Sequence, residues 1–238
     1  MINVFKSFVN AFAEYSFMPL PFYEDEGDRY KYIFVPLIGA IISVISYVWF
    51  LIGWHSRFND VSIALGVLLV AGIVTGGRHI LGFIDYIDGI PTYKYRFKTW
   101  KDSSHRGVFR FIVALSMWFI AMLNTYNYMF PLLFAGFVFS RIYIGLLSSL
   151  FNESTNQSRW TVAFLIIGYV ILNIMLYLEF EHLVICPILF TFFTFLGYIN
   201  KFRKTTDEML PLLEDDYIIT SETAWVFSAA MVSFILSL

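Results

Sequence analysis

The sequence is poor in cysteine and in charged residues, and each shortage excludes a class of protein. Cys186 is the single cysteine among 238 residues, which excludes an internal disulfide and a cysteine-based metal site. Only 14% of the residues are charged and 58% are hydrophobic, whereas an average soluble domain carries about 25% charged residues. The composition therefore argues against a soluble globular domain.

What the sequence has in abundance is long apolar stretches. A membrane-spanning helix needs about 20 mostly apolar residues, and the 27 Phe and 15 Tyr residues suit a chain with aromatic rings at the membrane boundary. The predicted spans are Tyr32–Ile52, Ile63–Ile84, Val108–Leu123, Tyr128–Leu150, Trp160–Leu178, Leu183–Ile199 and Ile218–Leu238. We therefore expect an all-α, polytopic membrane protein with about seven transmembrane helices, in which residues 1–238 form a single integral membrane domain.

The first 20 residues are predicted to form an amphipathic helix on the membrane surface. Their apolar residues recur at helical spacing, at Val4, Phe5, Phe8, Val9 and Phe12. Lys6 and Glu14 interrupt the segment, and it lacks an uninterrupted apolar core followed by a small-residue cleavage site. A cleavable signal peptide is therefore not expected here.

The distribution of Lys and Arg predicts the orientation in the membrane, because cytoplasmic loops retain positive charge. Three basic residues precede the first predicted span, six lie between the second and third, one between the fourth and fifth, and three between the sixth and seventh. Arg57 alone lies in the loops of the opposite side. The chain is therefore predicted to be a multi-pass protein of the inner (cytoplasmic) membrane with a cytoplasmic N-terminus.

The segment Thr75–Gly89 reads TGGRHILGFIDYIDG and carries two carboxylates near the inner edge of the bilayer. Asp85 and Asp88 are three residues apart, so on a helix both can point into one site. Such a pair in a membrane needs a cation, and Mg²⁺ commonly links carboxylates to substrate phosphates. The structural alternative is that Arg78 neutralises Asp85 and that Asp88, followed by glycine, marks a helix end.

A basic segment follows these carboxylates in the sequence and includes Lys94, Arg96, Lys98 and Lys101. Cations beside anionic metal ligands are suited to a pyrophosphate, with the metal on one side and Lys or Arg on the other. The same cations also fit contact with anionic lipid on the cytoplasmic face.

Two further polar positions lie within predicted spans. Arg141 follows Ser140 in the fourth span and needs an anionic partner, such as Asp85, Asp88 or a substrate phosphate, because an unpaired guanidinium is costly in a membrane. Glu222 lies at the start of the seventh span and has either a functional or an interfacial role.

Taken together, these segments resemble the cobalamin synthases, the adenosylcobinamide-GDP ribazoletransferases. The resemblance is carried by Phe17–Pro21, Phe34–Gly39, Thr75–Gly89, Lys101–Ser103, Ser140–Arg141, and Thr205 with Asp207. The segment Thr75–Gly89 is similar to a long family signature with three aspartates, and this chain has Leu81 at the first of them. A metal site of the family type would therefore lack one carboxylate here.

The resemblance implies a Mg²⁺-dependent transfer in which α-ribazole, or its 5′-phosphate, is joined to adenosylcobinamide-GDP and GMP is released. By this resemblance Asp85 and Asp88 hold the metal, and His79 or Asp102 takes the proton of the attacking hydroxyl. The expected substrate-binding residues are Lys101, Arg106, Arg141 and Asp207. The expected partners are corrinoid-nucleotide and nucleoside substrates and the lipid bilayer, without nucleic acid, and a homo-oligomer stays open.

Two other functions remain as alternatives. A different membrane phosphotransferase, acting on nucleotide-diphosphate alcohols, would carry an Asp-Gly-x-x-Ala-Arg motif that this sequence lacks. A transporter or a non-catalytic membrane partner would use Arg78, Asp85, Asp88 and Arg141 as an internal charge network. Transporter sites lie near the bilayer midplane, whereas these residues are predicted at its inner edge.

Overall fold

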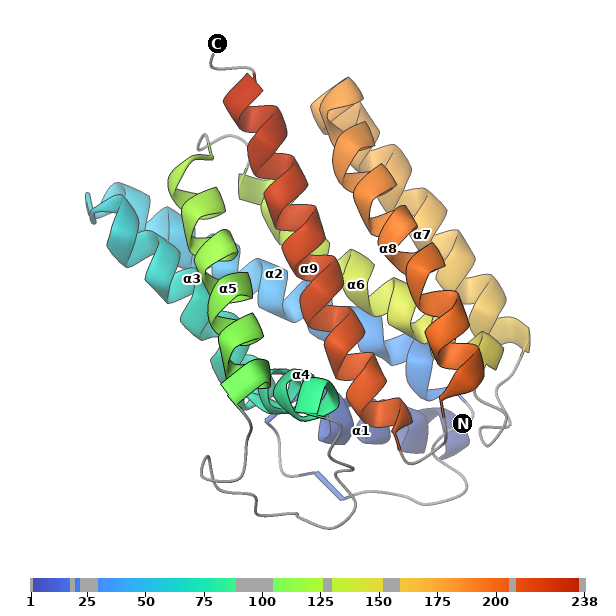
Figure 1. Ribbon diagram of the computed structural model, residues 1–238. Helices are drawn as coiled ribbons and strands as arrows, with labels where there is room; N and C mark the ends of the chain where they lie inside the picture. The colour runs from blue at the N-terminus through green and yellow to red at the C-terminus, as the bar shows by residue number, and fades with distance from the viewer. Residues whose placement is uncertain are drawn as a thin grey trace.

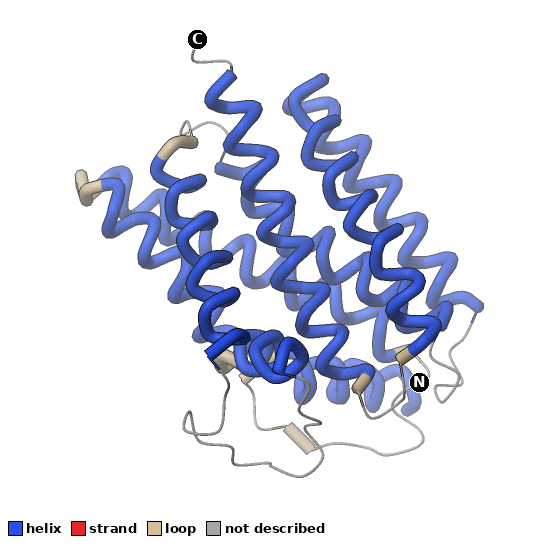
Figure 2. Tube along the Cα trace, in the orientation of Figure 1, coloured by secondary structure: helices blue, strands red, loops and turns tan. Residues whose placement is uncertain are grey.

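The chain folds as a bundle of helices (Figures 1 and 2). The computed structural model describes residues 2–17, 20–21, 30–88, 105–125, 130–151, 159–205 and 209–235, and within these ranges it contains no strand. The helices are α1 (Ile2–Tyr15), α2 (Lys31–His55), α3 (Asp60–Thr75), α4 (Arg78–Asp88), α5 (His105–Leu123), α6 (Phe130–Phe151), α7 (Arg159–Phe180), α8 (Ile185–Lys204) and α9 (Leu210–Ile235). The all-α prediction is confirmed.

Five helical stretches in the described ranges are long and apolar enough to cross a membrane, and the number rises to six if α3 and α4 form one bent span. One of the five, Arg159–Lys204, contains both α7 and α8, which a short 3-10 helix at Glu181–Val184 joins. Figure 1 shows α7 and α8 side by side. The chain is therefore a membrane protein, and the number of seven spans, which counts α7 and α8 separately, stays a prediction.

The second predicted span, Ile63–Ile84, is not one helix. Gly76 and Gly77 have φ angles of 63° and 70°, which glycine adopts at little cost because it has no Cβ. At these two residues the chain turns, and α3 and α4 enclose an angle of 86°. The prediction of a continuous helix was wrong, and α4 instead lies across the end of the bundle (Figure 1).

The core of the bundle is α6, which is buried along most of its length between α2 and α9. Gly39 of α2 lies so close to the carbonyl oxygen of Phe137 that a Cβ there would overlap it. Gly136 lies against the indole of Trp225 in α9, and the Trp225 Nε1 donates to the Leu132 carbonyl oxygen at 2.7 Å. Small residues thus permit the close helix contacts that membrane proteins use in place of a strong hydrophobic effect.

The predicted N-terminal helix is confirmed as α1. Its apolar face is partly covered, since Val9 and Phe12 are buried and Phe8 packs edge-on against Phe34 of α2 at 5.5 Å between ring centroids. Phe5 is 62% exposed. In Figure 1, α1 and α4 lie at the end of the bundle where α2, α5, α7 and α9 begin and where α6 and α8 end. The segments predicted to be cytoplasmic therefore border one side of the bundle, and the orientation itself stays a prediction.

Candidate functional site

The first turns of α9 carry three consecutive acids that the hydropathy pattern did not single out. The last span was predicted to begin at Ile218, but α9 begins at Leu210 and includes Glu214, Asp215 and Asp216. Consecutive residues of a helix point about 100° apart, so each acid faces a different neighbour. The only sequence signal for them is an acidic run immediately before an apolar stretch.

Glu214 accepts hydrogen bonds from three hydroxyl groups on three other helices. Its Oε2 accepts from the Tyr15 hydroxyl at 2.5 Å, and its Oε1 accepts from the hydroxyls of Tyr32 at 2.9 Å and Ser148 at 2.5 Å. Burial, and then the charge of Glu214, raise the pKa of Tyr15 well above its usual value of 10, so its hydroxyl stays protonated and donates. The buried carboxylate is therefore satisfied, and it joins α1, α2, α6 and α9.

The end of α1 is held by two further contacts. The Lys31 Nζ lies 2.8 Å from the Glu14 Oε2, and the Arg78 Nη1 donates to the carbonyl oxygens of Ala13 at 2.9 Å and Glu14 at 2.6 Å. The last carbonyls of a helix have no partner within it, so Arg78 caps α1. The alternative in which Arg78 neutralises Asp85 stays a prediction.

Asp215 faces α4 and contacts His79, one of the predicted catalytic residues. The Asp215 Oδ1 lies 2.5 Å from the His79 Nδ1, and His79 is buried. Gly82, on the next turn of α4, faces the same carboxylate so closely that a Cβ would overlap it. The imidazole is therefore held between α4 and α9.

Asp216 faces α8 and is also paired. It accepts a hydrogen bond from the Tyr198 hydroxyl at 2.5 Å, and the Lys201 Nζ lies 3.6 Å from its Oδ2. The Lys201 ammonium also lies over the Tyr198 ring, 4.0 Å from the centroid. This contact fastens the start of α9 to the end of α8.

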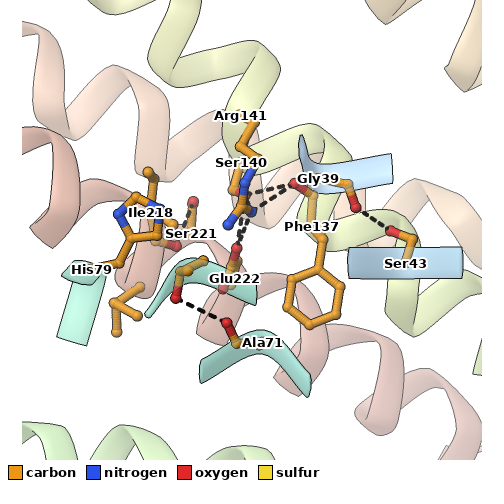
Figure 3. A network of polar contacts seen from close by, with 12 residues as sticks. Gly39, Ser43, Ala71, His79, Phe137, Ser140, Arg141, Ile218, Ser221 and Glu222 are labelled. Atoms are coloured by element: carbon orange, nitrogen blue, oxygen red, sulfur yellow. Dashed lines mark hydrogen bonds and ion pairs between the residues drawn. The ribbon is translucent and has the colours of Figure 1, made fainter. Parts of the chain in front are cut away.

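Arg141 pairs with Glu222 inside the bundle, as Figure 3 shows. The Arg141 Nη1 lies 2.5 Å from the Glu222 Oε1 and also donates to the Phe137 carbonyl oxygen at 2.9 Å and the Ser140 Oγ at 3.1 Å. Both charged residues are buried. The sequence offered Asp85, Asp88 or a substrate phosphate as the partner of Arg141, and the structure shows Glu222 instead. An interfacial role for Glu222 was wrong, because Glu222 is buried in the middle of α9.

A cavity of about 70 Å³ lies between the His79–Asp215 pair and the Arg141–Glu222 pair. Residues of α3, α4, α5, α6 and α9 line it, and most of them are apolar. Its polar lining includes Thr75, His79, Arg141 and Glu222. Within the described ranges, the His79 Nε2 and the Arg141 Nε are buried and have no hydrogen-bond partner.

The predicted metal ligands lie on a different face of α4 from His79. Helical spacing places Leu81, Asp85 and Asp88 within about 60° of one another around the helix axis, turned away from His79. Leu81 is 46% exposed and Asp85 is partly buried. The described part of the helix extends to Asp88, and the helix end predicted at Gly89 lies outside the described residues. Among the side chains that the structure describes, no three His, Cys, Asp or Glu lie close enough together to hold a metal ion.

The other predicted site residues are divided between described and undescribed parts of the chain. Lys101, Asp102 and Asp207 lie outside the described residues, as does the side chain of Asp88. Arg106 is exposed in the first turn of α5, at the same end of the bundle as α4 (Figure 1). The roles of these residues stay predictions.

Comparison with known proteins shows similarity to one enzyme family. The model of the cobalamin-5-phosphate synthase family matches residues 7–208. An adenosylcobinamide-GDP ribazoletransferase of Lachnoclostridium phytofermentans is 34% identical over 107 residues, which cover 43% of this chain and 41% of that protein. An enzyme with the same name from Clostridium botulinum (strain Eklund 17B) is 29% identical over 128 residues, covering 50% of this chain and 49% of the relative. These matches thus span less than half the length of each relative, and no solved structure matches the chain.

Proposed function

We propose, since the chain belongs to the cobalamin-5-phosphate synthase family, that it is a membrane transferase that completes the nucleotide loop of cobalamin. In this reaction an oxygen of α-ribazole, or of its 5′-phosphate, bonds to the phosphorus that adenosylcobinamide-GDP carries on the corrinoid. The bond between that phosphorus and GMP breaks, and GMP leaves. The observation that carries the proposal is the family match over residues 7–208.

The polar residues at one end of the bundle support this assignment. A pyrophosphate cannot enter the hydrocarbon core without a large cost, so its binding site should lie where polar residues gather at the membrane border. Helix α4 lies across that end of the bundle (Figure 1) and carries Asp85 and Asp88. One face of α4 is exposed beside α5. The first turn of α5 holds Arg106.

The donor set on α4 fits a magnesium ion. Mg²⁺ is usually held by one or two carboxylates and completes its shell with water and substrate phosphates. Asp85 and Asp88 supply two carboxylates on one helix face, so Leu81 weakens the set without removing it. When bound, Mg²⁺ would neutralise charge on the pyrophosphate.

The remaining roles follow from charge and position. We assign phosphate contacts to Lys101 and Arg106, and we leave Arg141 out because Glu222 already neutralises it. Asp102 is the candidate for taking the proton of the attacking hydroxyl, because His79 lies on the face of α4 turned away from Asp85 and Asp88.

The test is a transfer assay with purified protein in liposomes, supplied with adenosylcobinamide-GDP, α-ribazole and Mg²⁺. We expect release of GMP together with the joined corrinoid product, both measured by liquid chromatography. Asp85→Asn should lower the rate at least about 100-fold, because a metal-held phosphate contact is worth several kcal/mol in the transition state. Asp60→Asn, which changes an exposed acid at the start of α3, serves as the matched control. Absence of GMP release by the wild type, or full activity of Asp85→Asn, would contradict the proposal.

A non-catalytic or transport role is the second candidate, and the buried pair of Arg141 and Glu222 favours it. A charge pair inside a bundle is a feature that transporters also use. In that case the same liposomes should accumulate labelled cobinamide compounds without producing GMP. Product formation without accumulation would exclude this role.

A further inference from the structure

Asp215 and His79 form a pair whose geometry is fixed by the packing of α9 against α4. Their side chains are 15% and 4% exposed, and 2.5 Å separates the Asp215 Oδ1 from the His79 Nδ1. Gly82 removes the side chain that would otherwise displace the Asp215 carboxylate. The contact therefore depends on α4 and α9 lying directly against each other.

This contact selects one tautomer of the imidazole. A carboxylate only accepts hydrogen bonds, so it favours the form of neutral His79 that carries its proton on Nδ1. The Nε2 atom then has a free lone pair and can accept a proton. Without the carboxylate, both neutral tautomers would be accessible.

The other side of the ring borders the cavity described above. His79 lines that cavity, and its buried Nε2 has no partner among the residues that the structure describes. The volume of about 70 Å³ is room for water molecules. The hydroxyl end of a larger molecule also fits. A hydroxyl group suits this lining because it donates to a ring nitrogen and accepts from an N–H such as the Arg141 Nε–H.

We propose that Asp215 is a positioning residue, which holds His79 in the tautomer that accepts a hydroxyl hydrogen bond at Nε2. This role rests on the proposed function. Because Asp85 and Asp88 lie on the opposite face of α4, the role of the Asp215–His79 pair is to bind and orient a hydroxyl group of the acceptor, and the proton of the attacking hydroxyl goes to another base.

The first test is nuclear magnetic resonance of the purified protein with ¹⁵N-labelled histidine. The chain has four histidines, and a His79→Gln variant identifies the resonances of His79 by their loss. We expect a protonated Nδ1 and an unprotonated Nε2 in the wild type at neutral pH. Asp215→Asn should mix the two tautomers. Asp216→Asn is the matched control, because it removes a neighbouring acid that contacts Tyr198 and not His79.

The second test separates binding from catalysis. In the transfer assay Asp215→Asn should raise the KM for α-ribazole about tenfold and change kcat less than threefold, because one hydrogen bond to the bound hydroxyl is weakened. Adding α-ribazole alone should shift the Nε2 resonance, and an unchanged resonance would contradict the binding of its hydroxyl at this atom.

The resonances of His79 test its contact with Asp215 even if the transfer reaction is not the activity of this protein. A wild-type Nε2 that carries a proton, or a tautomer ratio that Asp215→Asn leaves unchanged, would overturn the positioning role. Equal rises of KM in Asp215→Asn and Asp216→Asn would assign both acids to packing. Absence of turnover with the expected tautomer would instead overturn the proposed reaction and keep the assignment of the pair.

Discussion

Replacing Glu222 by glutamine tests how the bundle tolerates its buried arginine. Glutamine keeps the shape and one acceptor oxygen of the side chain but removes the negative charge 2.5 Å from the Arg141 Nη1. The guanidinium then has only neutral acceptors, which are this amide oxygen, the Phe137 carbonyl oxygen and the Ser140 Oγ. With an exposed fraction of 1%, Arg141 cannot reach solvent to compensate.

The expected cost follows from this burial. Removing one partner of a buried ion pair lowers the free energy of unfolding by about 3–5 kcal/mol. Because an amide oxygen remains, we expect the lower end, about 3 kcal/mol, which is roughly a 100-fold change in the unfolding equilibrium. The double variant Arg141→Met, Glu222→Met should cost less than Glu222→Gln alone, because no charge is left unpaired.

The measurement is equilibrium unfolding by sodium dodecyl sulfate in mixed micelles, followed by tryptophan fluorescence. Glu179→Gln is the control, because it changes an exposed glutamate of α7 and should shift the free energy of unfolding by less than about 0.5 kcal/mol. A loss below about 1 kcal/mol for Glu222→Gln would refute the reasoning. A double variant less stable than Glu222→Gln would also refute it, because the unpaired charge of Arg141 would then not be the main cause of the lost free energy of unfolding.

Two further predictions concern packing and the metal site. Gly39→Ala should lower the free energy of unfolding by about 1–3 kcal/mol, because its new Cβ meets the α6 backbone. Gly197→Ala, with no atom within 4 Å of the new Cβ, should not lower it. Thermal unfolding in detergent compares the two variants, and equal effects would contradict the tight contact at Gly39. Leu81→Asp should reduce the Mg²⁺ concentration for half-maximal activity about tenfold, because each added carboxylate raises the affinity of such a site for the metal. An unchanged Mg²⁺ titration would place the metal elsewhere.

The sequence predicted the helices well where apolar length alone decides. Each predicted span overlaps a helix. The break at Gly76 and Gly77 was not predicted, because glycine is common within membrane helices and its presence does not distinguish a tight helix contact from a turn. Only the positive φ angles reveal the turn.

The polar contacts were harder to predict because they depend on which helices become neighbours. The sequence required an anionic partner for Arg141 and suggested Asp85, Asp88 or a substrate phosphate, and Glu222 was not among them. The acids from Glu214 to Asp216 were not considered, because the last span was predicted to begin at Ile218. Each is neutralised or hydrogen-bonded by a different helix, a property of the packed bundle that no local window contains.

The hydroxyl contacts of Glu214 also constrain the order in which the chain can assemble. Tyr15 and its acceptor are 199 residues apart, so α1 leaves the ribosome long before α9 has been made. Until then the Tyr15 hydroxyl lacks this carboxylate. Insertion of α9 therefore completes the contact that holds α1 against the bundle.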